Sequence, residues 1–507
     1  MKTFFAPTFF LVIAICYLIF SYSHTFAHFG GDNAFYFMMM KSFSPFTGAN
    51  DIEQYFSINS QYPPLYPLLA SYLGGSINIA YAHLITTLFL LFSYPLIIGI
   101  LKTEGLPTFA ANLAAILFFL LPGTYLHTLS LNSENLYILT SLILIYSCIK
   151  FEKKENAKHF IVIIISVAAT CLTRTAGYSL MIATIIYLLI HNRKYCLYFS
   201  IIFSPVLLWQ LLKETNNNAS YSRSFFESYS QLNYLELTSS LKHQFFSLVQ
   251  GWNTNFTYSL TINYIIIAFG IICLAGATQR LLNKKLDAIY VFIYLLMVVV
   301  WPFPAEATRL IFALLPVMLI QGILFTNDIS VAIYKKKASL FVCATLSLLY
   351  IIVAPDLILN IKRYNTKTPP GLEPYVHTNA WFLPNKKNAS DQIALMDSVI
   401  YAMQELNQFI PEGQCVYSIK PPIISLYANR ISKRVPEHIF QTNKTSDFKK
   451  HIDCEYFFMI SYTSPSFPQT LYPLELIKSE ISIIKLYFLD ENNSKLAALL
   501  GKVDKSL

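Results

Sequence analysis

Eleven segments without Asp, Glu, Lys or Arg restrict what this chain can fold into. They cover residues 4–20, 79–101, 105–133, 135–149, 160–173, 175–190, 195–212, 263–279, 288–305, 310–327 and 338–355. A helix needs about 20 apolar residues to cross the hydrocarbon core of a bilayer, and several segments reach that length. The chain is only 13% charged, against about 25% in soluble proteins. The sequence therefore predicts a polytopic α-helical membrane domain with about eleven transmembrane helices.

The distribution of basic residues predicts the orientation, because Lys and Arg are enriched in short cytoplasmic loops. With a cytoplasmic N-terminus, the inner loops carry 14 Lys and Arg residues, and the outer loops up to residue 355 carry 6. An odd number of spans then leaves the C-terminal part outside. We expect the first run to be a retained anchor rather than a cleaved signal peptide, because its apolar stretch is long. If the source is bacterial, the expected location is the inner membrane.

The composition divides the chain into two predicted domains. Residues 1–355 form a transmembrane domain whose outer loop, 21–78, carries the first candidate site, and residues 356–507 form an extracytoplasmic domain. Helical spacing of apolar residues predicts a helix over 391–409. Three apolar segments are expected to be strands: 415–419, 454–462 and 481–489. Strands that alternate with short helices are typical of a small α/β domain.

Cys415 and Cys454 both lie in the predicted extracytoplasmic domain. An oxidising compartment permits a disulfide between them, but pairing also requires a short Cα–Cα distance that the sequence does not give. A disulfide and two unpaired thiols therefore both stay open. No CxxC motif or His/Cys metal spacing occurs in the chain.

Asp32 is the first candidate for a catalytic residue. It follows Gly30 and Gly31 just beyond the first apolar run and precedes residues 33–43, which are expected to form a surface helix. A carboxylate at the boundary between water and lipid can accept the proton of an attacking hydroxyl. The alternative is an aspartate that only caps the helix. The aromatic and proline-rich segment 61–69, which returns to the bilayer, favours the catalytic interpretation.

Four further charged residues lie at the predicted outer boundary. Glu134 follows a long charge-free run and could orient an acceptor hydroxyl, bind a metal or cap the next helix. Arg174 and Arg309 lie at membrane depth, where arginine is costly unless paired and where it can bind phosphate bidentately. Lipid headgroups or Glu306 are the alternative partners. Lys41 could hold a phosphate, although an anchor at the lipid interface is the simpler role.

Aromatic residues and histidines give weaker signals. Tyr36, Tyr62 and Tyr66 could line a sugar or lipid groove, but aromatic residues are ordinary at membrane interfaces. His83 and His127 are single histidines, and a single histidine is more often a hydrogen-bonded structural residue than a ligand. The sequence therefore assigns no metal ligands.

The ordered set of these segments resembles the GT-C superfamily of membrane glycosyltransferases, and within it bacterial relatives of protein O-mannosyltransferases and the lipid A aminoarabinose transferase. The segments that carry the resemblance are 31–36, 62–68, 133–136, 172–177, 309–316, 413–417 and 426–430. The Trp-Trp-Asp signature of oligosaccharyltransferase subunits is absent. This absence argues against transfer of a whole glycan to asparagine.

The resemblance implies a glycosyltransferase that moves a sugar from a polyprenyl- or dolichyl-phosphate donor to a lipid, glycan or protein hydroxyl. Transfer would occur on the extracytoplasmic face by a single inverting displacement. Asp32 matches the family's first-loop acid, the expected base, and Glu134 matches a second acidic position. Arg309, Arg174 and Lys41 are the expected phosphate-binding residues.

The expected partners are the lipid-linked donor, the acceptor and membrane lipids, and nucleic acid is not among them. No cofactor is required by this scheme, although a dependence on a divalent metal stays open. The alternative functions are a polytopic lipid or sugar transporter and an O-antigen ligase-like protein. Transporters favour ionisable groups at mid-membrane and repeated halves, whereas the charges here cluster at the outer boundary.

Overall fold

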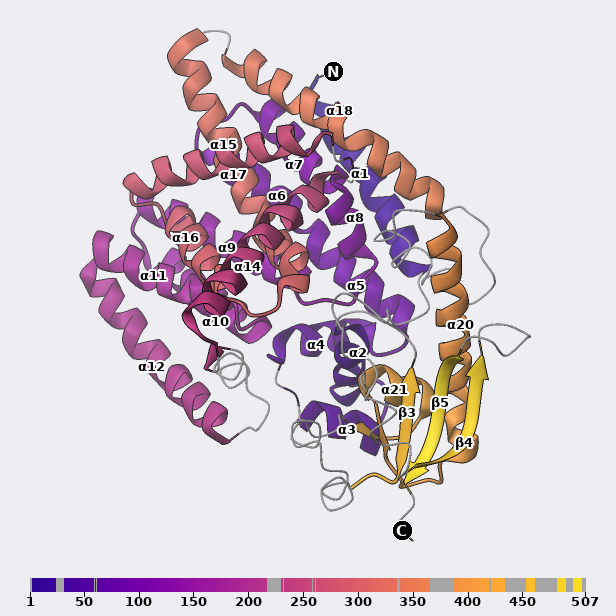
Figure 1. Ribbon diagram of the computed structural model, residues 1–507. Coiled ribbons are helices and arrows are strands. Elements are labelled where there is room, and N and C mark those ends of the chain that lie inside the picture. The colour runs from indigo at the N-terminus through magenta and orange to yellow at the C-terminus, as the bar shows by residue number, and fades with distance from the viewer. Residues whose placement is uncertain are drawn as a thin grey trace. The chain divides into compact units, whose positions relative to one another are not determined.

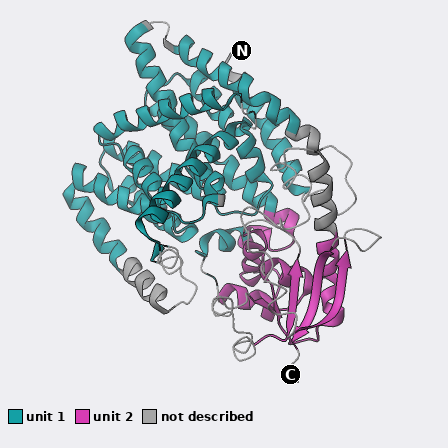
Figure 2. Ribbon diagram, in the orientation of Figure 1, with its two compact units in different colours: residues 1–23, 60–70, 83–362 teal, residues 24–59, 71–82, 363–507 magenta. Residues whose placement is uncertain are grey.

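The computed structural model describes residues 2–23, 32–58, 60, 62–216, 229–230, 232–257, 259, 261–334, 338–364, 386–418, 421–433, 453–460, 481–488 and 496–503. These residues fall into two compact units, which Figure 2 colours separately. Unit 1 contains residues 1–23, 60–70 and 83–362, and unit 2 contains residues 24–59, 71–82 and 363–507. The predicted boundary at residue 355 lies close to the end of unit 1. The two predicted domain functions stay predictions.

Unit 1 is helical (Figure 1). Its elements are α1 (Lys2–Tyr22), α4 (Leu65–Ala70), α5 (Ile79–Leu91), α6 (Ser93–Thr103), α7 (Thr108–Leu120), α8 (Pro122–Thr128), α9 (Glu134–Lys153), α10 (Ala157–Thr173), α11 (Gly177–His191), α12 (Arg193–Asn216), α14 (Tyr234–Phe256), α15 (Asn263–Leu282), α16 (Leu286–Val299), the short 3₁₀ turn η2 (Pro304–Glu306), α17 (Ala307–Tyr334) and α18 (Ala338–Tyr364). The first four residues of α5 belong to unit 2.

Each of the eleven charge-free segments forms helix over most of its length. Among the described residues, five helices are long and apolar enough to cross a membrane, or six if the bent pair α7–α8 counts as one span. Helices α10, α11 and α16 are apolar but shorter, as is the stretch of α1 from Ala6 to Tyr22. The helical membrane character is therefore confirmed, and the total of eleven spans stays a prediction.

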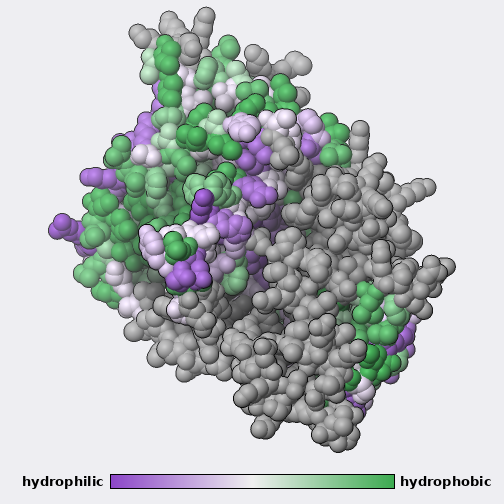
Figure 3. Space-filling view, viewed as in Figure 1, coloured by the Kyte–Doolittle hydropathy of each residue, from purple (hydrophilic) through white to green (hydrophobic). Residues whose placement is uncertain are grey.

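The outward faces of unit 1 are apolar. Figure 3 shows hydrophobic side chains over much of the visible surface of its helices. Ile161 and Ile165 of α10 and Leu189 of α11 are among the exposed side chains, each more than half accessible. A soluble protein rarely exposes a large contiguous apolar surface. The surface therefore fits contact with lipid, as expected for an integral membrane protein.

The charge-free segment 105–133 contains a broken helix, α7–α8, rather than one straight span. Pro122 has no N–H to donate to the carbonyl oxygen of Phe118, so the helix bends there by 62°. The Oγ1 of Thr124 donates to that carbonyl oxygen instead, at 2.5 Å. Because Pro122 starts α8 and the freed acceptor is satisfied, the chain continues as a second, tilted helix.

Charged side chains lie at both ends of helix α9. Its 20 residues are about 30 Å long, close to the thickness of a bilayer core. Glu134 begins the helix, and Lys150 and Lys153 lie in its last turn. Beside that last turn, Glu152 pairs with Lys285 at 2.6 Å. The two charged groups therefore lie a membrane's thickness apart.

Arg280 of α15 is buried and connects that helix to α16 and to the C-terminal end of α6. Arg280 makes two bonds to Asp287, at 2.7 and 3.0 Å, and a third to Glu104 at 2.7 Å. Gln321 of α17 donates to Asp287 at 3.1 Å. Each charge has an opposite partner, which is the condition for burying ionic groups. The charges of this cluster are therefore explained by the contacts that they make between helices.

Unit 2 contains a mixed five-stranded sheet (Figure 1). Its elements are α2 (Asn33–Ser42), α3 (Asp51–Ile58), the π-helical turn η1 (Ser71–Gly75), α20 (Lys386–Phe409), β1 (Val416–Tyr417), α21 (Pro421–Ala428), β2 (Ser432–Lys433), β3 (Tyr456–Ile460), β4 (Ile481–Phe488) and β5 (Leu496–Val503). The strand order is β2-β1-β3-β5-β4, parallel as far as β3 and antiparallel beyond it.

One face of this sheet packs against α20 and α21. Val399, Met403 and Leu406 of α20 share one apolar core with α21 and with alternate strand residues. Ala34 of α2 belongs to the same core, so the segment that follows Asp32 is built into the C-terminal α/β fold. The predicted helix over 391–409 is found within α20, and the predicted strands correspond to β1, β3 and β4.

Strand β5 was not anticipated, because Leu496–Val503 is rich in Ala and Leu, which favour helix. It is nevertheless the strand between β3 and β4, so tertiary pairing decides its structure. A Cβ placed on Gly501 would lie 2.2 Å from Ile481 of β4. Glycine is therefore required for that pairing.

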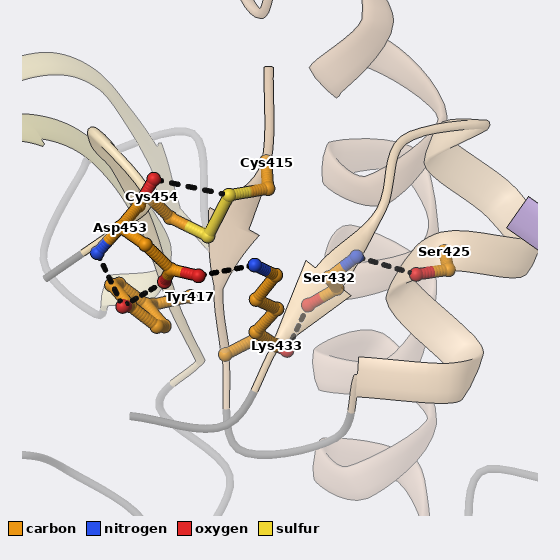
Figure 4. Close-up of a disulfide and its surroundings, with 8 residues drawn as sticks. Cys415, Tyr417, Ser425, Ser432, Lys433, Asp453 and Cys454 are labelled. Atoms are coloured by element: carbon orange, nitrogen blue, oxygen red, sulfur yellow. Dashed lines mark hydrogen bonds and ion pairs between the residues drawn. A yellow bond between two sulfur atoms is a disulfide. The ribbon is translucent and has the colours of Figure 1, made fainter. Parts of the chain in front are cut away.

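A disulfide joins Cys415 to Cys454 and resolves the alternative that the sequence left open (Figure 4). It links the residues that precede β1 and β3, two neighbouring strands. Beside it, the hydroxyl of Tyr417 donates to the carboxylate of Asp453, which also accepts a bond from Lys433. The disulfide thus cross-links two neighbouring parallel strands near their first residues.

Candidate functional site

Asp32 occupies the N-cap position of α2, where the alternative role as a helix cap would place it. Its backbone carbonyl accepts the first helical bond, from Tyr36 N at 2.9 Å. Its half-buried side chain, however, forms no capping hydrogen bond with the helix. Capping therefore does not account for the carboxylate. Gly30 and Gly31, which were expected to allow close approach, lie outside the described residues.

Lys41, at the end of α2, pairs with Glu53 at 2.9 Å. Glu53 is buried and belongs to a capping box at the start of α3: Asn50 N donates to its carboxylate at 3.0 Å, and Glu53 N donates to Asn50 Oδ1 at 2.9 Å. Lys41 thus ties α2 to α3. Its expected role in binding the donor phosphate stays a prediction.

The three tyrosines expected to line a substrate groove differ in burial. Tyr36 of unit 2 is 2% exposed. Tyr66 is fully buried in unit 1, and its hydroxyl bonds the Oγ1 of Thr86 at 2.7 Å. Tyr62 is half-buried. Of the three, Tyr62 has the most surface available to a ligand.

Glu134, Arg174 and Arg309 meet in unit 1. The Oε1 of Glu134 accepts from the Nε of Arg309 and also pairs with the Nη1 of Arg174. The side chain of Glu134 is fully buried, whereas those of Arg174 and Arg309 are 11% and 21% exposed. The carboxylate is therefore enclosed, whereas both arginine side chains retain some accessible surface.

Local backbone features bring the two arginines to this carboxylate. Arg174 ends α10 in an extended conformation, and its N–H bonds the carbonyl of Thr170 at 3.0 Å. The chain turns so sharply there that a Cβ on Gly177 would lie 2.4 Å from the Thr170 backbone. Arg309 lies in the first turn of α17, where Asn255 of α14 donates to the carbonyl of Thr308 at 3.1 Å.

His127, which the sequence did not assign to the site, lies beside this cluster. Its ring stacks on Phe312 with centroids 3.7 Å apart, and Phe312 is three residues beyond Arg309 in α17. The Nδ1 of His127 is 2.8 Å from the side-chain amide of Asn132. The ring lies close enough to Glu134, Arg174 and Arg309 to interact electrostatically with each. A single sequence offered no signal that α8 would bend towards α17.

The charges favour an anionic ligand. Two guanidinium groups share the Glu134 carboxylate at the start of α9. The partly exposed arginine faces can bind phosphate oxygens bidentately. Glu134 already pairs with the two arginines, and its expected role in orienting the acceptor stays a prediction.

A metal does not fit Glu134, because two cationic side chains contact its Oε1 and would repel a divalent ion. Within the described parts of the chain, the one group of three ligand-type residues close enough for a metal is Cys415, Asp453 and Cys454. Both sulfurs are used in the disulfide, so they do not supply thiolates.

The structure brings some of the predicted residues together and leaves others untested. Glu134, Arg174 and Arg309 form one cluster in unit 1, and Asp32 and Lys41 belong to unit 2. The convergence of Asp32 with Glu134 and Arg309 in one outer cavity stays a prediction.

Comparison with solved structures identifies the fold. No family model matches the chain, and no curated protein matches it by sequence. Among solved structures it is similar to ArnT from Cupriavidus metallidurans bound to undecaprenyl phosphate, with a TM-score of 0.51, 12% identity and coverage of 99% of this chain and 98% of that one. The apo form of that ArnT gives a TM-score of 0.54 at 11% identity, with 99% and 98% covered.

A second similar structure is the archaeal oligosaccharyltransferase AglB from Archaeoglobus fulgidus, in complex with an inhibitory peptide and a dolichol-phosphate. The TM-score is 0.52 at 12% identity, over 99% of this chain and 75% of that one. ArnT and AglB are both GT-C glycosyltransferases. The chain therefore has the GT-C fold, and the resemblance seen in its sequence is confirmed at that level.

Proposed function

We propose that this protein is a membrane glycosyltransferase that moves a single sugar from a polyprenyl-phosphate donor to a hydroxyl acceptor. The observation that carries the proposal is the pair Arg174 and Arg309 held on the buried carboxylate of Glu134. Similar structures hold dolichol-phosphate and undecaprenyl phosphate. A net cationic pair of guanidinium groups is suited to the phosphate of such a carrier.

Asp32 acts as the base in this proposal. Its carboxylate takes the proton of the acceptor hydroxyl while the acceptor oxygen bonds to the anomeric carbon of the sugar. The bond from that carbon to the phosphate oxygen breaks, and its electron pair stays on the phosphate. Because attack and departure occur on opposite sides, the anomeric configuration inverts.

Arg174 and Arg309 stabilise the negative charge that grows on the departing phosphate. The phosphodiester carries about one negative charge and the released monoester close to two, so a fixed cationic site binds the product side of the reaction more strongly. Glu134 supports this step as a positioning residue: it fixes both guanidinium groups before the substrate arrives. No covalent intermediate is required.

The extracytoplasmic location of the C-terminal domain is part of the proposal. The Cys415–Cys454 disulfide is the kind of bond that persists in oxidising compartments and is rare in the cytosol. The basic residues of the predicted inner loops support the same orientation. The transfer would therefore occur on the outer face of the membrane.

Of the two alternatives, a transporter has one specific feature in its favour, the broken helix α7–α8, because transporters often bind substrate at broken helices. The similar structures are transferases, and the charged residues of this cluster lie at the end of α9. An O-antigen ligase-like function has no separate support.

The test is a comparison of surface glycans between cells that express the wild-type protein, no protein, or the Asp32→Asn variant. Mass spectrometry of glycolipids and glycoproteins should show one sugar modification lost in the deletion strain and in Asp32→Asn. The lipid-linked sugar should accumulate in both. Loss of a general base commonly lowers a rate by about 10²- to 10⁴-fold.

The matched control is Asp51→Asn, which removes an exposed aspartate from the first turn of α3 in the same unit. This variant should keep the wild-type glycan pattern. Normal modification by a folded, membrane-inserted Asp32→Asn protein would refute Asp32 as the base. If deletion of the gene changes no glycan while sugar uptake or lipid export changes, the transporter interpretation gains support.

A further inference from the structure

We propose that His127 is a third hydrogen-bond donor of the anion site formed by Arg174 and Arg309, and that it binds the phosphate of the prenyl carrier. This inference rests on the proposed function, because it adds a residue to the same site. It concerns a side chain that was first interpreted as structural.

The contact with Asn132 bears on which ring nitrogen of His127 carries the proton. The amide nitrogen of Asn132 lies 2.8 Å from the Nδ1 of His127, and an amide N–H₂ group is a donor only. With the amide in this orientation, Nδ1 accepts and a neutral imidazole carries its proton on Nε2. The ring thus presents an N–H donor on the side away from Asn132.

Two contacts fix the orientation of that donor. The imidazole is nearly parallel to the ring of Phe312, at an interplanar angle of 12° and a centroid distance of 3.7 Å. Phe312 and Arg309 lie about one turn apart on α17, so the stack places the histidine beside the arginine. The side-chain amide of Asn135 donates to the backbone carbonyl of His127 at 3.1 Å, which ties α8 to the first turn of α9.

The position of His127 suits contact with a ligand. The histidine lies near the end of α8, the tilted half of the broken helix, and in membrane proteins such breaks are tolerated where they line a site or are buried in protein. Its side chain is half-buried rather than fully buried. Like the two arginines, and unlike Glu134, it therefore retains accessible surface.

A structural role alone would need only the stack and the bond to Asn132. Phenylalanine could provide the stack, whereas a histidine in this tautomer also provides Nε2–H next to two cationic groups. A neutral donor adds a hydrogen bond to phosphate without adding a third positive charge to the cluster. His127 would therefore supply one neutral hydrogen-bond donor beside the two arginines.

The test measures binding of farnesyl phosphate, a short prenyl phosphate, to the full-length protein in detergent, with farnesol as the uncharged comparison. His127→Phe keeps a ring to stack on Phe312 but loses the donor. His127→Gln keeps an N–H donor at the end of a side chain of comparable length. A hydrogen bond to a charged group contributes about 1.5–3 kcal/mol, so His127→Phe should weaken farnesyl phosphate binding by about 10- to 100-fold.

His127→Gln should recover most of the lost affinity, and farnesol should bind all three proteins equally. The farnesol measurement also shows that each variant is folded, because a misfolded protein would lose both ligands. If His127→Phe binds farnesyl phosphate as the wild type does, the inference is wrong. If His127→Phe loses farnesol binding as well, that variant is misfolded and His127→Gln carries the test. Near wild-type farnesyl phosphate binding by His127→Gln then supports the donor, and a loss with farnesol binding intact overturns it.

One comparison separates this inference from the proposed function. Arg309→Gln should abolish farnesyl phosphate binding if the cluster holds the phosphate at all. Loss in Arg309→Gln with wild-type binding in His127→Phe overturns only the role of His127. Wild-type binding in both variants overturns the phosphate site itself.

Discussion

Arg309 donates from its Nε to the Oε1 of Glu134, a residue that precedes it by 175 positions. The same oxygen is paired with Arg174. One buried carboxylate therefore holds two arginines, one at the end of α10 and one in the first turn of α17. This relationship explains why an otherwise apolar unit retains three charged residues at one end of α9.

The role of Glu134 can be tested by Glu134→Gln, which removes the negative charge and keeps the size. Removal of one partner from a buried ion pair typically destabilises a protein by about 3–5 kcal/mol, so thermal unfolding in detergent should occur at a lower temperature. We also expect weaker farnesyl phosphate binding, because the two guanidinium groups would repel each other and separate. Tighter binding would instead mean that the carboxylate only moderates the charge, which contradicts a positioning role.

Arg309→Lys tests the shape of the site rather than its charge. Lysine keeps the positive charge but loses the planar, bidentate group. We expect farnesyl phosphate affinity to fall by about tenfold, the effect of losing one good hydrogen bond to an anion. Arg193→Gln is the control, because Arg193 is an exposed arginine at the start of α12 and should leave binding unchanged. Equal affinities for Arg309→Lys and wild type would show that charge alone suffices.

The disulfide should stabilise unit 2. It joins residues 39 positions apart, and removal of a native disulfide typically costs about 2–5 kcal/mol. Cys415→Ser/Cys454→Ser should lower the unfolding temperature of the full-length protein, and a reducing agent should lower that of the wild type to a similar extent. Cys343→Ala, which changes an unpaired cysteine of α18, serves as the control. A wild-type protein that is indifferent to reduction would contradict this prediction.

An ion pair on the sheet should make stability depend on acid pH. The Glu405 carboxylate accepts bonds from Lys485 and from the hydroxyl of Tyr401, each at 2.5 Å. The bond from Lys485, followed by that from Tyr401, holds the pKa of Glu405 below its ordinary value of 4.5. The unfolded chain therefore binds the proton at a higher pH than the folded chain does. The contribution is complete above pH 4.5 and is lost as the pH falls through the lowered pKa.

Unfolding of wild type and Glu405→Gln should be compared between pH 7 and pH 3. The wild type should be more stable at pH 7, by less than about 1 kcal/mol because the pair lies near the surface, and the two proteins should converge as the pH falls. Glu412→Gln, an exposed glutamate in the turn after α20, should retain the wild-type pH dependence. A difference that persists at pH 3 would show that the pair does not act through its charge.

Much of the candidate site could be proposed from the sequence because its chemistry is local. Asp32 was predicted from its place after an apolar run, and its role stays a prediction. Glu134, Arg174 and Arg309 were predicted because charge is rare at the ends of apolar segments, and these three side chains do meet. Their shared contact could not be predicted, since α9, α10 and α17 pack together only in the folded unit. His127 was overlooked for the same reason: its partner Phe312 is distant in the chain.

The sequence by itself determined that this is a helical membrane protein with a small α/β domain, because apolar run length and residue spacing act within single segments. Only the tertiary structure decided that Cys415 pairs with Cys454, that Leu496–Val503 becomes a strand and that two arginines share Glu134. These features depend on side chains from distant segments coming within a few ångströms of each other. Local propensity carries no information about such distances, because the packing of the whole chain sets them.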